Sequence, residues 1–261
     1  MKRILLFVLL ALPMTCGPAT AKDTIGRNEV VQALENPFKG YGEAGSDPSG
    51  SKIADFQGTF SQTSNLVSLN REQRGTGRVW VKFDRSSSDG DPRTMFRWEY
   101  EQPTQQEIVS DGETMWVYLP ENNQVILSDM DFSSQPQQED PMAFLTGLGN
   151  LSRDFRIPEE TPETDKEGNY IIELRPRKDS RLIERMTIVV DREAVAEYAR
   201  NDSVGDNFPI HSSTVYDQSG NSTLIEFHDV RLNKDLSESL FSFTIPEQAD
   251  VVRAEDAQMG F

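Results

Sequence analysis

The side chains that most often carry out catalysis are few in this sequence and poorly spaced for it. His211 and His228 have no flanking metal-ligand pattern, and each is typical of an ordinary strand residue. Asp111 and Glu113 lie close together, but an Asp-Gly turn between two strands explains them. No Gly-x-Ser-x-Gly segment is present. We therefore expect neither an enzyme nor a bound cofactor.

Glycine and cysteine patterns also offer little chemistry. Gly75-x-Gly77 and Gly147-x-Gly149 are weak candidates for phosphate loops, because neither leads from a strand into a helix. The single cysteine, Cys16, excludes a disulfide framework and a cysteine-based zinc site.

The charge balance excludes two classes of partner. The 261 residues include 26 Lys and Arg against 43 Asp and Glu, a formal net charge of −17. Nucleic acids require a basic footprint, which this chain lacks. Charge alone would also keep the protein off an anionic membrane.

The first 21 residues have the layout of a secretory signal peptide. Lys2 and Arg3 precede the apolar run 4–12, which is too short to span a bilayer, and Ala19-Thr20-Ala21 follows as a cleavage site. We expect export and a mature chain that begins at Lys22 without a cysteine, as suits an oxidising compartment. The alternative is a lipid anchor at Cys16, although the preceding residues 13–15 fit a lipidation signal poorly.

The rest of the chain reads mainly as strands at hairpin spacing. Helices are predicted at Asn28–Leu34, with Asn28 as its N-cap, and at Pro141–Leu148, whereas 40–51 and 158–168 read as loops. The predicted strands are 56–62, 77–83, 95–101, 106–110, 114–119, 124–127, 170–175, 186–191, 210–216, 223–230 and 241–245. This pattern predicts a mainly β, single-domain antiparallel barrel or strongly curved sheet.

Side-chain alternation predicts one face rich in large apolar groups. Phe96, Trp98 and Tyr100 share a face of their strand, opposite Arg97 and Glu99. Two interpretations stay open at this point. The face is either a packed barrel core or the lining of a cavity for an apolar ligand.

Several segments resemble one known family, the outer-membrane lipoprotein carriers of the LolA type. The likeness is most specific in Phe96–Tyr100 and in Val109-Ser110-Asp111-Gly112, and it extends in order over most of 53–252. It includes 54–62, 77–82, 141–145, 227–233 and 241–246.

The resemblance implies an unclosed antiparallel β-barrel with short α-helices as a lid over an apolar cavity. It further implies a periplasmic carrier, a monomer without nucleic-acid partners. Such a carrier collects lipoproteins from an inner-membrane ABC-type release complex, holds their acyl chains and passes them to an outer-membrane acceptor. On this basis the signal peptide spans 1–21 and the carrier domain 22–261, with a helix and inserted loop at 22–52 and the barrel core at 53–252. The predicted acyl-chain contacts are Phe56, Val79, Val81, Phe83, Met95, Phe96, Trp98, Tyr100, Met115, Trp116, Met142 and Leu145.

One departure from the family concerns an arginine tied to lid closure and release. In the family it directly precedes a proline, but here Asp91 precedes Pro92. Arg85 and Arg93 are the candidates for this role, although the interpretation we favour from sequence is a solvated loop charge in each case. Two other functions remain: a regulator of the same fold that binds lipid or lipoprotein and signals through a membrane partner, and a secreted β protein with a filled core.

Overall fold

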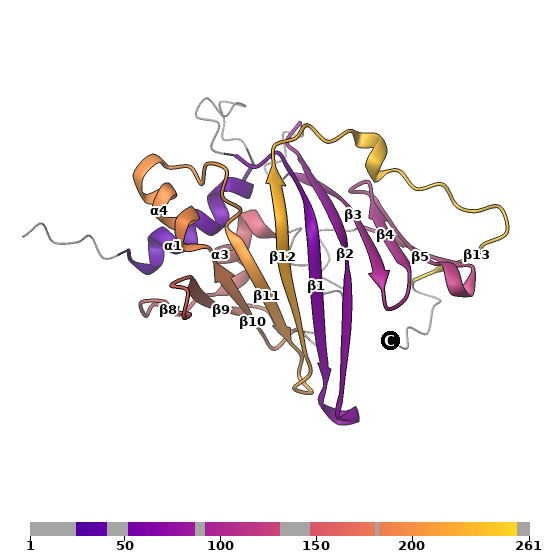
Figure 1. Ribbon diagram of the computed structural model, residues 1–261, viewed down its shortest axis with the longest axis horizontal. Helices are drawn as coiled ribbons and strands as arrows, with labels where there is room; N and C mark the ends of the chain where they lie inside the picture. The colour runs from indigo at the N-terminus through magenta and orange to yellow at the C-terminus, as the bar shows by residue number, and fades with distance from the viewer. Residues whose placement is uncertain (1–24, 41–51, 87–91, 131–146, 181–182, 255–261) are drawn as a thin grey trace, which may run out of the picture.

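A single curved sheet dominates the molecule (Figure 1). The computed structural model describes residues 25–40, 52–86, 92–130, 147–180 and 183–254. The strands of these residues are β1 (Asp55–Leu66), β2 (Arg71–Asp84), β3 (Arg93–Gln102), β4 (Gln106–Ser110), β5 (Thr114–Leu119), β6 (Gln124–Asp129), β7 (Phe155–Arg156), β8 (Glu163–Thr164), β9 (Tyr170–Pro176), β10 (Arg185–Val190), β11 (Ile210–Tyr216), β12 (Ser222–Leu232) and β13 (Asp250–Arg253).

The sheet is mostly antiparallel and does not close. Its strand order is β13-β6-β5-β4-β3-β2-β1-β12-β11-β10-β9-β7, with β8 also paired to β9. Among the described strands only the β13–β6 pair is parallel. The predicted fold class, an unclosed antiparallel barrel with short helices, is confirmed.

Turn chemistry sets the hairpins that build the long β1–β6 meander. In the β4–β5 turn the carboxylate of Asp111 accepts hydrogen bonds from the backbone N–H groups of Glu113 at 2.9 Å and Thr114 at 2.8 Å. Gly112 follows at φ +89°, a conformation that side-chain-bearing residues rarely adopt. The β1–β2 and β5–β6 turns each end on an asparagine at positive φ, Asn70 and Asn123.

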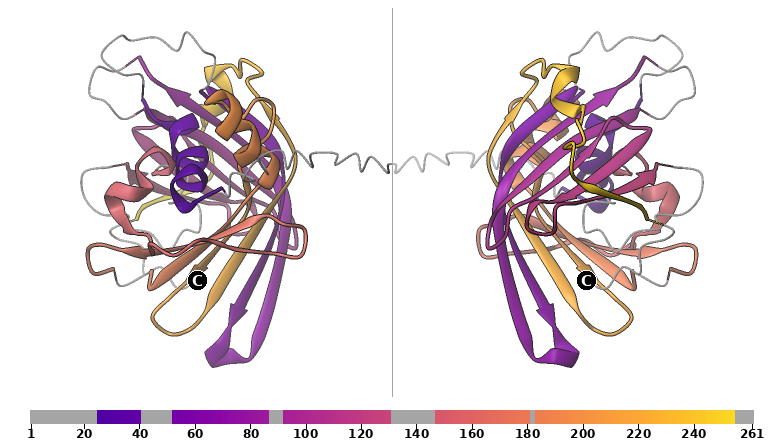
Figure 2. Two further views of the ribbon diagram at one scale, coloured as in Figure 1. Left: turned by 90° about the vertical axis from the view of Figure 1, so that its left-hand side faces the viewer. Right: turned by 90° about the vertical axis from the view of Figure 1, so that its right-hand side faces the viewer.

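Three α-helices of the described chain lie inside the curve of the sheet (Figures 1 and 2). They are α1 (Arg27–Glu35), α3 (Leu151–Asp154) and α4 (Arg192–Asn201). Single 3-10 turns occur at 36–38, 67–69, 120–122, 148–150 and 238–241. None of the helices in the described ranges has the length and apolar character needed to cross a membrane.

The first predicted helix is confirmed as α1, but its predicted N-cap is wrong. The cap is Gly26, because the carboxylate of Glu29 reaches back to the Gly26 N–H at 3.1 Å. Most of the second predicted helix, 141–146, lies outside the described residues. Its last part, Leu148, begins a 3-10 turn that continues through Gly149 into α3.

Two other features differ from the sequence prediction. The predicted strand 241–245 does not form; Phe241 ends a 3-10 turn, and the chain then runs along the outside of the sheet (Figure 2). The helix α4 was not predicted. Its N-terminus is fixed by Asp191, whose carboxylate accepts from the N–H groups of Glu193 at 3.0 Å and Ala194 at 2.7 Å.

The C-terminal segment 233–254 is fastened to the outer, convex face. Asp55 is buried there, and its carboxylate accepts from the backbone N–H groups of Lys234 at 2.7 Å and Leu236 at 3.2 Å. Lys82 Nζ donates to the carbonyl of Leu236 at 2.7 Å. The segment then ends in β13, which pairs with β6. It therefore packs along the face of the sheet opposite the helices.

Candidate functional site

The concave face of the sheet carries a continuous aromatic and aliphatic layer. β1, β2, β3 and β12 contribute most of it, because alternate residues of each strand point inward. The rings of Phe60 and Trp98 have centroids 4.3 Å apart, and Phe60 also meets Tyr100 edge-on at 5.0 Å. Nearer the helices, Phe56 packs against Phe208 at 4.7 Å. The layer therefore runs unbroken along the inside of the barrel.

The helices pack over this layer. α1 buries Val30, Val31, Ala33 and Leu34, and it packs against α4. Beneath these helices Val79, Val81 and Trp98 are 0% exposed. The described residues thus show a closed state in which the apolar interior is filled by the protein's own side chains.

A shallow surface pocket opens beside this layer. A surface pocket of about 240 Å³ is lined by Phe208 and Phe227 of the apolar layer, with Asp191, Asp206 and His211 among its polar residues. Ligand pockets for small molecules are commonly about 300–1,000 Å³. This pocket is therefore smaller than a typical ligand pocket.

The structure gathers most of the predicted contact residues into this layer. Those buried in it are Phe56, Val79, Val81, Phe83, Phe96, Trp98 and Met115, with Tyr100 partly buried at its margin. Met142 and Leu145 lie outside the described residues. The layer also contains residues that were not selected, notably Phe60, Phe227 and the apolar side of α4. Phe60 could have been found, because it follows Phe56 at an even spacing on the same strand.

Met95 and Trp116 are not part of this layer. Met95 precedes Phe96 on β3 and therefore points outward, where it packs with Leu236 and Phe241. Trp116 likewise points outward, and its ring stacks on Phe243 at 6.3 Å. Both lie where the C-terminal segment packs on the outer face of the sheet.

Arg85 donates hydrogen bonds to the turn that follows α1, the first helix of the lid over the apolar layer. Its Nε donates to the carbonyl of Lys39 at 3.0 Å, and its Nη2 donates to the carbonyls of Pro37 at 3.2 Å and Ile53 at 2.9 Å. Pro37 and Lys39 belong to the turn that follows α1. The guanidinium also lies over the ring of Phe83, 5.6 Å from its centroid. Arg85 is therefore not a solvated loop charge, contrary to the interpretation favoured from sequence.

Arg93 has a different position and different partners. Its guanidinium pairs with Asp84 at 3.0 Å and Glu113 at 3.4 Å, beside the outward-facing Met95 and Trp116. Burial alone would raise the pKa of Asp84, but hydrogen bonds from Ser86 and the Arg93 guanidinium outweigh it and hold that pKa below its ordinary value. Both partners of Arg93 belong to the sheet and its turns, so this arginine stabilises the outer face.

A second lid contact was not predicted from sequence. Glu35, at the end of α1, is 4% exposed, and its carboxylate accepts from the backbone N–H of Ser152 in α3. Lys39 lies 3.4 Å from the other carboxylate oxygen. Glu35 thus joins α1 to the short helix that follows the 131–146 segment.

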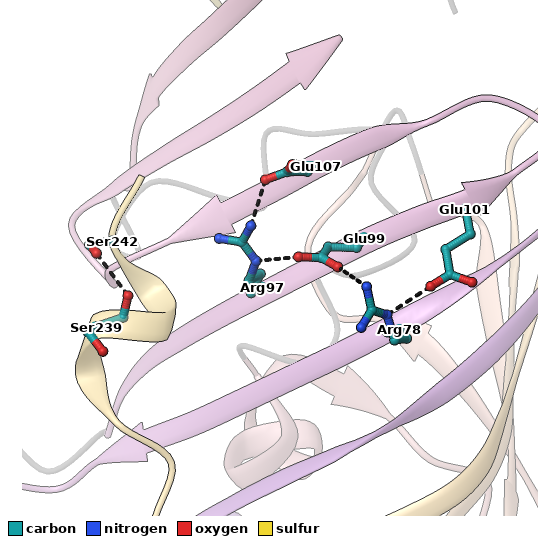
Figure 3. Close-up of polar contacts among 7 residues, drawn as sticks. All are labelled: Arg78, Arg97, Glu99, Glu101, Glu107, Ser239 and Ser242. Atoms are coloured by element: carbon teal, nitrogen blue, oxygen red, sulfur yellow. Dashed lines mark hydrogen bonds and ion pairs between the residues drawn. The ribbon is translucent and has the colours of Figure 1, made fainter. Parts of the chain in front are cut away.

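Beyond the apolar contacts of the C-terminal segment, the outer face carries a ladder of ion pairs (Figure 3). Arg78 contacts Glu99 and Glu101, each at 2.8 Å, and Arg97 contacts Glu99 at 2.6 Å and Glu107 at 2.7 Å. The same strands therefore present a charged exterior and an apolar interior.

The described residues thus form an unclosed, mostly antiparallel sheet with a buried apolar interior and short helices inside its curve. The chain belongs to the LolA family: the family model "Outer membrane lipoprotein carrier protein LolA" matches residues 51–244. The members of this family are carrier proteins and not enzymes.

Individual relatives agree with this assignment. An outer-membrane lipoprotein carrier protein of Chromohalobacter salexigens is 28% identical over 202 residues, which cover 77% of this chain and 81% of the relative. The outer-membrane lipoprotein carrier protein of Nitrosomonas europaea is 27% identical over 202 residues, which cover 77% of this chain and 84% of the relative.

Solved structures give weaker likenesses. An uncharacterized conserved protein from Thermus thermophilus has a TM-score of 0.46 at 16% identity, over 87% of this chain and 98% of that one. A LolA superfamily protein from Nitrosomonas europaea has a TM-score of 0.39 at 14% identity, over 84% of this chain and 99% of that one. Both scores are below 0.5, and we draw no functional conclusion from them.

Proposed function

We propose that this protein is a periplasmic carrier, exported by the signal peptide 1–21, with 22–261 as its carrier domain. It binds the acyl chains of lipoproteins that an ABC-type complex releases from the inner membrane, and it delivers them to an acceptor at the outer membrane. The observation that carries the proposal is the buried apolar layer inside the curve of the sheet, together with the turn after α1 that Arg85 holds through backbone carbonyls.

The energetics of this arrangement suit a carrier. Burying an acyl chain yields about 0.8 kcal/mol per CH₂, so a chain of ordinary length cannot cross water unprotected. In the closed state α1 already buries Val30, Val31 and Leu34 on the same surface. Each such aliphatic side chain yields about 1.5–3 kcal/mol. Binding exchanges one apolar cover for another, which keeps the net affinity low enough for release.

The cover is also suited to opening. Arg85 donates to main-chain oxygens of the turn after α1, so opening breaks a few polar contacts and needs no rearrangement of the sheet. The carbonyls can then be hydrated, whereas the exposed apolar surface requires a ligand.

The proposal is tested by native mass spectrometry of the protein purified from the periplasm of a Gram-negative host. Wild-type protein should carry acylated polypeptide. Phe96→Glu places a charge in the apolar layer and should abolish the bound species. The matched control Trp116→Glu introduces the same side chain on the outer face and should retain it.

A clean unliganded mass for the wild type, with no response to titrated lipopeptide, would mean that the interior is a permanently filled core. Loss of cargo in both variants, with both still folded, would also contradict a binding site on the concave face.

A further inference from the structure

The apolar interior contains a buried hydrogen-bond donor for which the described part of the chain provides no acceptor. Trp98 is 0% exposed, and its indole Nε1–H has no hydrogen-bond partner among the described residues. Buried tryptophan N–H groups usually find an acceptor, because an unmade hydrogen bond away from water is costly. The nearest rings, Phe60 and Phe227, offer at most weak contacts with their faces.

A second buried group has the same character. The hydroxyl of Ser213 on β11 is also without a partner in the part of the chain that the structure describes. Ser213 lies in register with Ile188 and Ile225, both members of the apolar layer. Two polar groups without a partner among the described residues therefore lie in the apolar layer.

The polarity of the concave face changes along β1 and β3. Toward the helices the face is aromatic, with Phe56 and Phe83 beneath the turn that follows α1. Toward the hairpin ends it becomes polar. There Tyr100 Oη donates to Gln62 Oε1 at 2.6 Å, and Gln62 Nε2 donates to Ser64 Oγ at 3.1 Å. Trp98 lies between these two zones, paired with Val79 and two residues from Tyr100.

This order matches the order of groups in an acyl ester: hydrocarbon tail, then carbonyl, then polar glyceryl end. We propose that the interior recognises an acyl ester, with the Trp98 Nε1–H donating to its carbonyl oxygen. The tail then lies toward Phe56 and Phe83, and the glyceryl end lies toward Tyr100 and Gln62. This inference rests on the proposed function and specifies which part of the cargo is recognised.

A hydrogen bond to the ester carbonyl would fix the depth at which the acyl chain lies in the interior. Hydrocarbon tails alone slide in an apolar layer, because hydrophobic contact has no direction. One directed hydrogen bond at a fixed depth sets how far the chain enters. The Trp98 N–H is poorly satisfied in the closed state, so the bond to the ligand is gained without breaking another.

The test compares two synthetic lipopeptides that differ only in linkage: a diacylglyceryl-cysteine peptide with ester carbonyls and its dialkyl ether analogue. Wild-type protein should bind the ester about three- to tenfold more tightly, the worth of one net hydrogen bond. In Trp98→Phe the ratio of the two affinities should fall to about one. Trp116→Phe, the same substitution on the outer face, should leave the ratio as in wild type.

A second readout does not depend on how well the variant folds. In ¹H–¹⁵N spectra of wild-type protein, the Trp98 indole peak should shift downfield with the ester and not with the ether. A phospholipid with the same ester chains identifies the source of the ligand. If it binds with the same shift, the site takes acyl esters generally; if it is excluded, the site is restricted to lipoprotein anchors.

Equal binding of both lipopeptides by wild type, or a preference that survives in Trp98→Phe, would overturn the ester contact and leave the carrier function standing. An ether-induced shift equal to that of the ester would do the same. Failure of wild type to bind either lipopeptide would overturn both proposals together.

Discussion

Replacing Arg85 should release the helical cover without unfolding the sheet. In Arg85→Gln the donations to Pro37 and Lys39, at 3.2 and 3.0 Å, are lost. Hydrogen bonds to a charged group contribute about 1.5–3 kcal/mol each when buried, and partial exposure places these two at the lower end. We therefore expect the closed state to lose about 2–3 kcal/mol, which makes the open state about 30- to 150-fold more populated.

Hydrogen exchange measures this opening directly. The amides of Val31 to Leu34 in α1 should exchange faster by about that factor, because local opening sets their rate. Amides of β3 around Trp98 should change little, since the sheet stays paired. Arg85→Lys keeps the charge but has no planar fork, so it should give an intermediate acceleration. Arg93→Gln removes an arginine of the outer face and should leave α1 unaffected.

Two results would refute this reasoning. Unchanged protection of α1 in Arg85→Gln would mean that the apolar contacts alone hold the cover. Equal acceleration in α1 and β3 would mean that Arg85 supports the whole fold and has no specific role at the lid.

Three further perturbations test other parts of the structure. Asp55→Ala removes the acceptor of one buried and one partly buried N–H group of the C-terminal segment, so urea unfolding should show a loss of about 1–3 kcal/mol per group at most, with faster proteolysis within 233–254. Gly77→Ala should destabilise by about 1–3 kcal/mol in the same assay, because a Cβ there meets the ring of Phe60 and a backbone carbonyl; an unchanged midpoint would contradict the packing of the apolar layer. The lowered native pKa of Asp84 means that its charged form stabilises the fold above its ordinary pKa of 3.8, and that this stability is lost as pH falls through the native pKa. Wild type should therefore melt at a higher temperature than Asp84→Asn at neutral pH, and the difference should shrink as pH falls below 3.8 and through the lower native pKa; a difference that does not shrink in acid would contradict the assignment.

The strands could be predicted where turn residues and alternation agreed. Residues 106–110 and 114–119 match β4 and β5 because Asp111 and Gly112 fix the turn between them. α4 was missed because it is short, polar on average and placed between two strands. Its signal was present nonetheless: Asp191 is a favourable N-cap, and Ala194 and Tyr198 follow at helical spacing.

The alternation of apolar and polar side chains shows which face of a strand each residue lies on, but it does not show which strands pair with one another. The pattern of 241–245 is typical of a strand, yet the segment finds no neighbouring backbone among the described strands and packs its phenylalanines on the outside of the sheet. Met95 and Trp116 were included among the predicted acyl-chain contacts, although their positions on β3 and β5 place them on the outer face. The role of Arg85 required the path of the chain after α1, which no local pattern contains.

An unclosed sheet has two exposed edges, and such edges invite other chains to pair with them. In this protein one edge ends in β7, a strand of two residues, beside the equally short β8. The other edge ends in β13, four residues long, with Asp250 and Arg253 at its two ends. Short and charged edge strands are poor templates for aggregation. Because β13 of the C-terminal segment pairs with β6, the longer β6 does not offer its own edge to another chain.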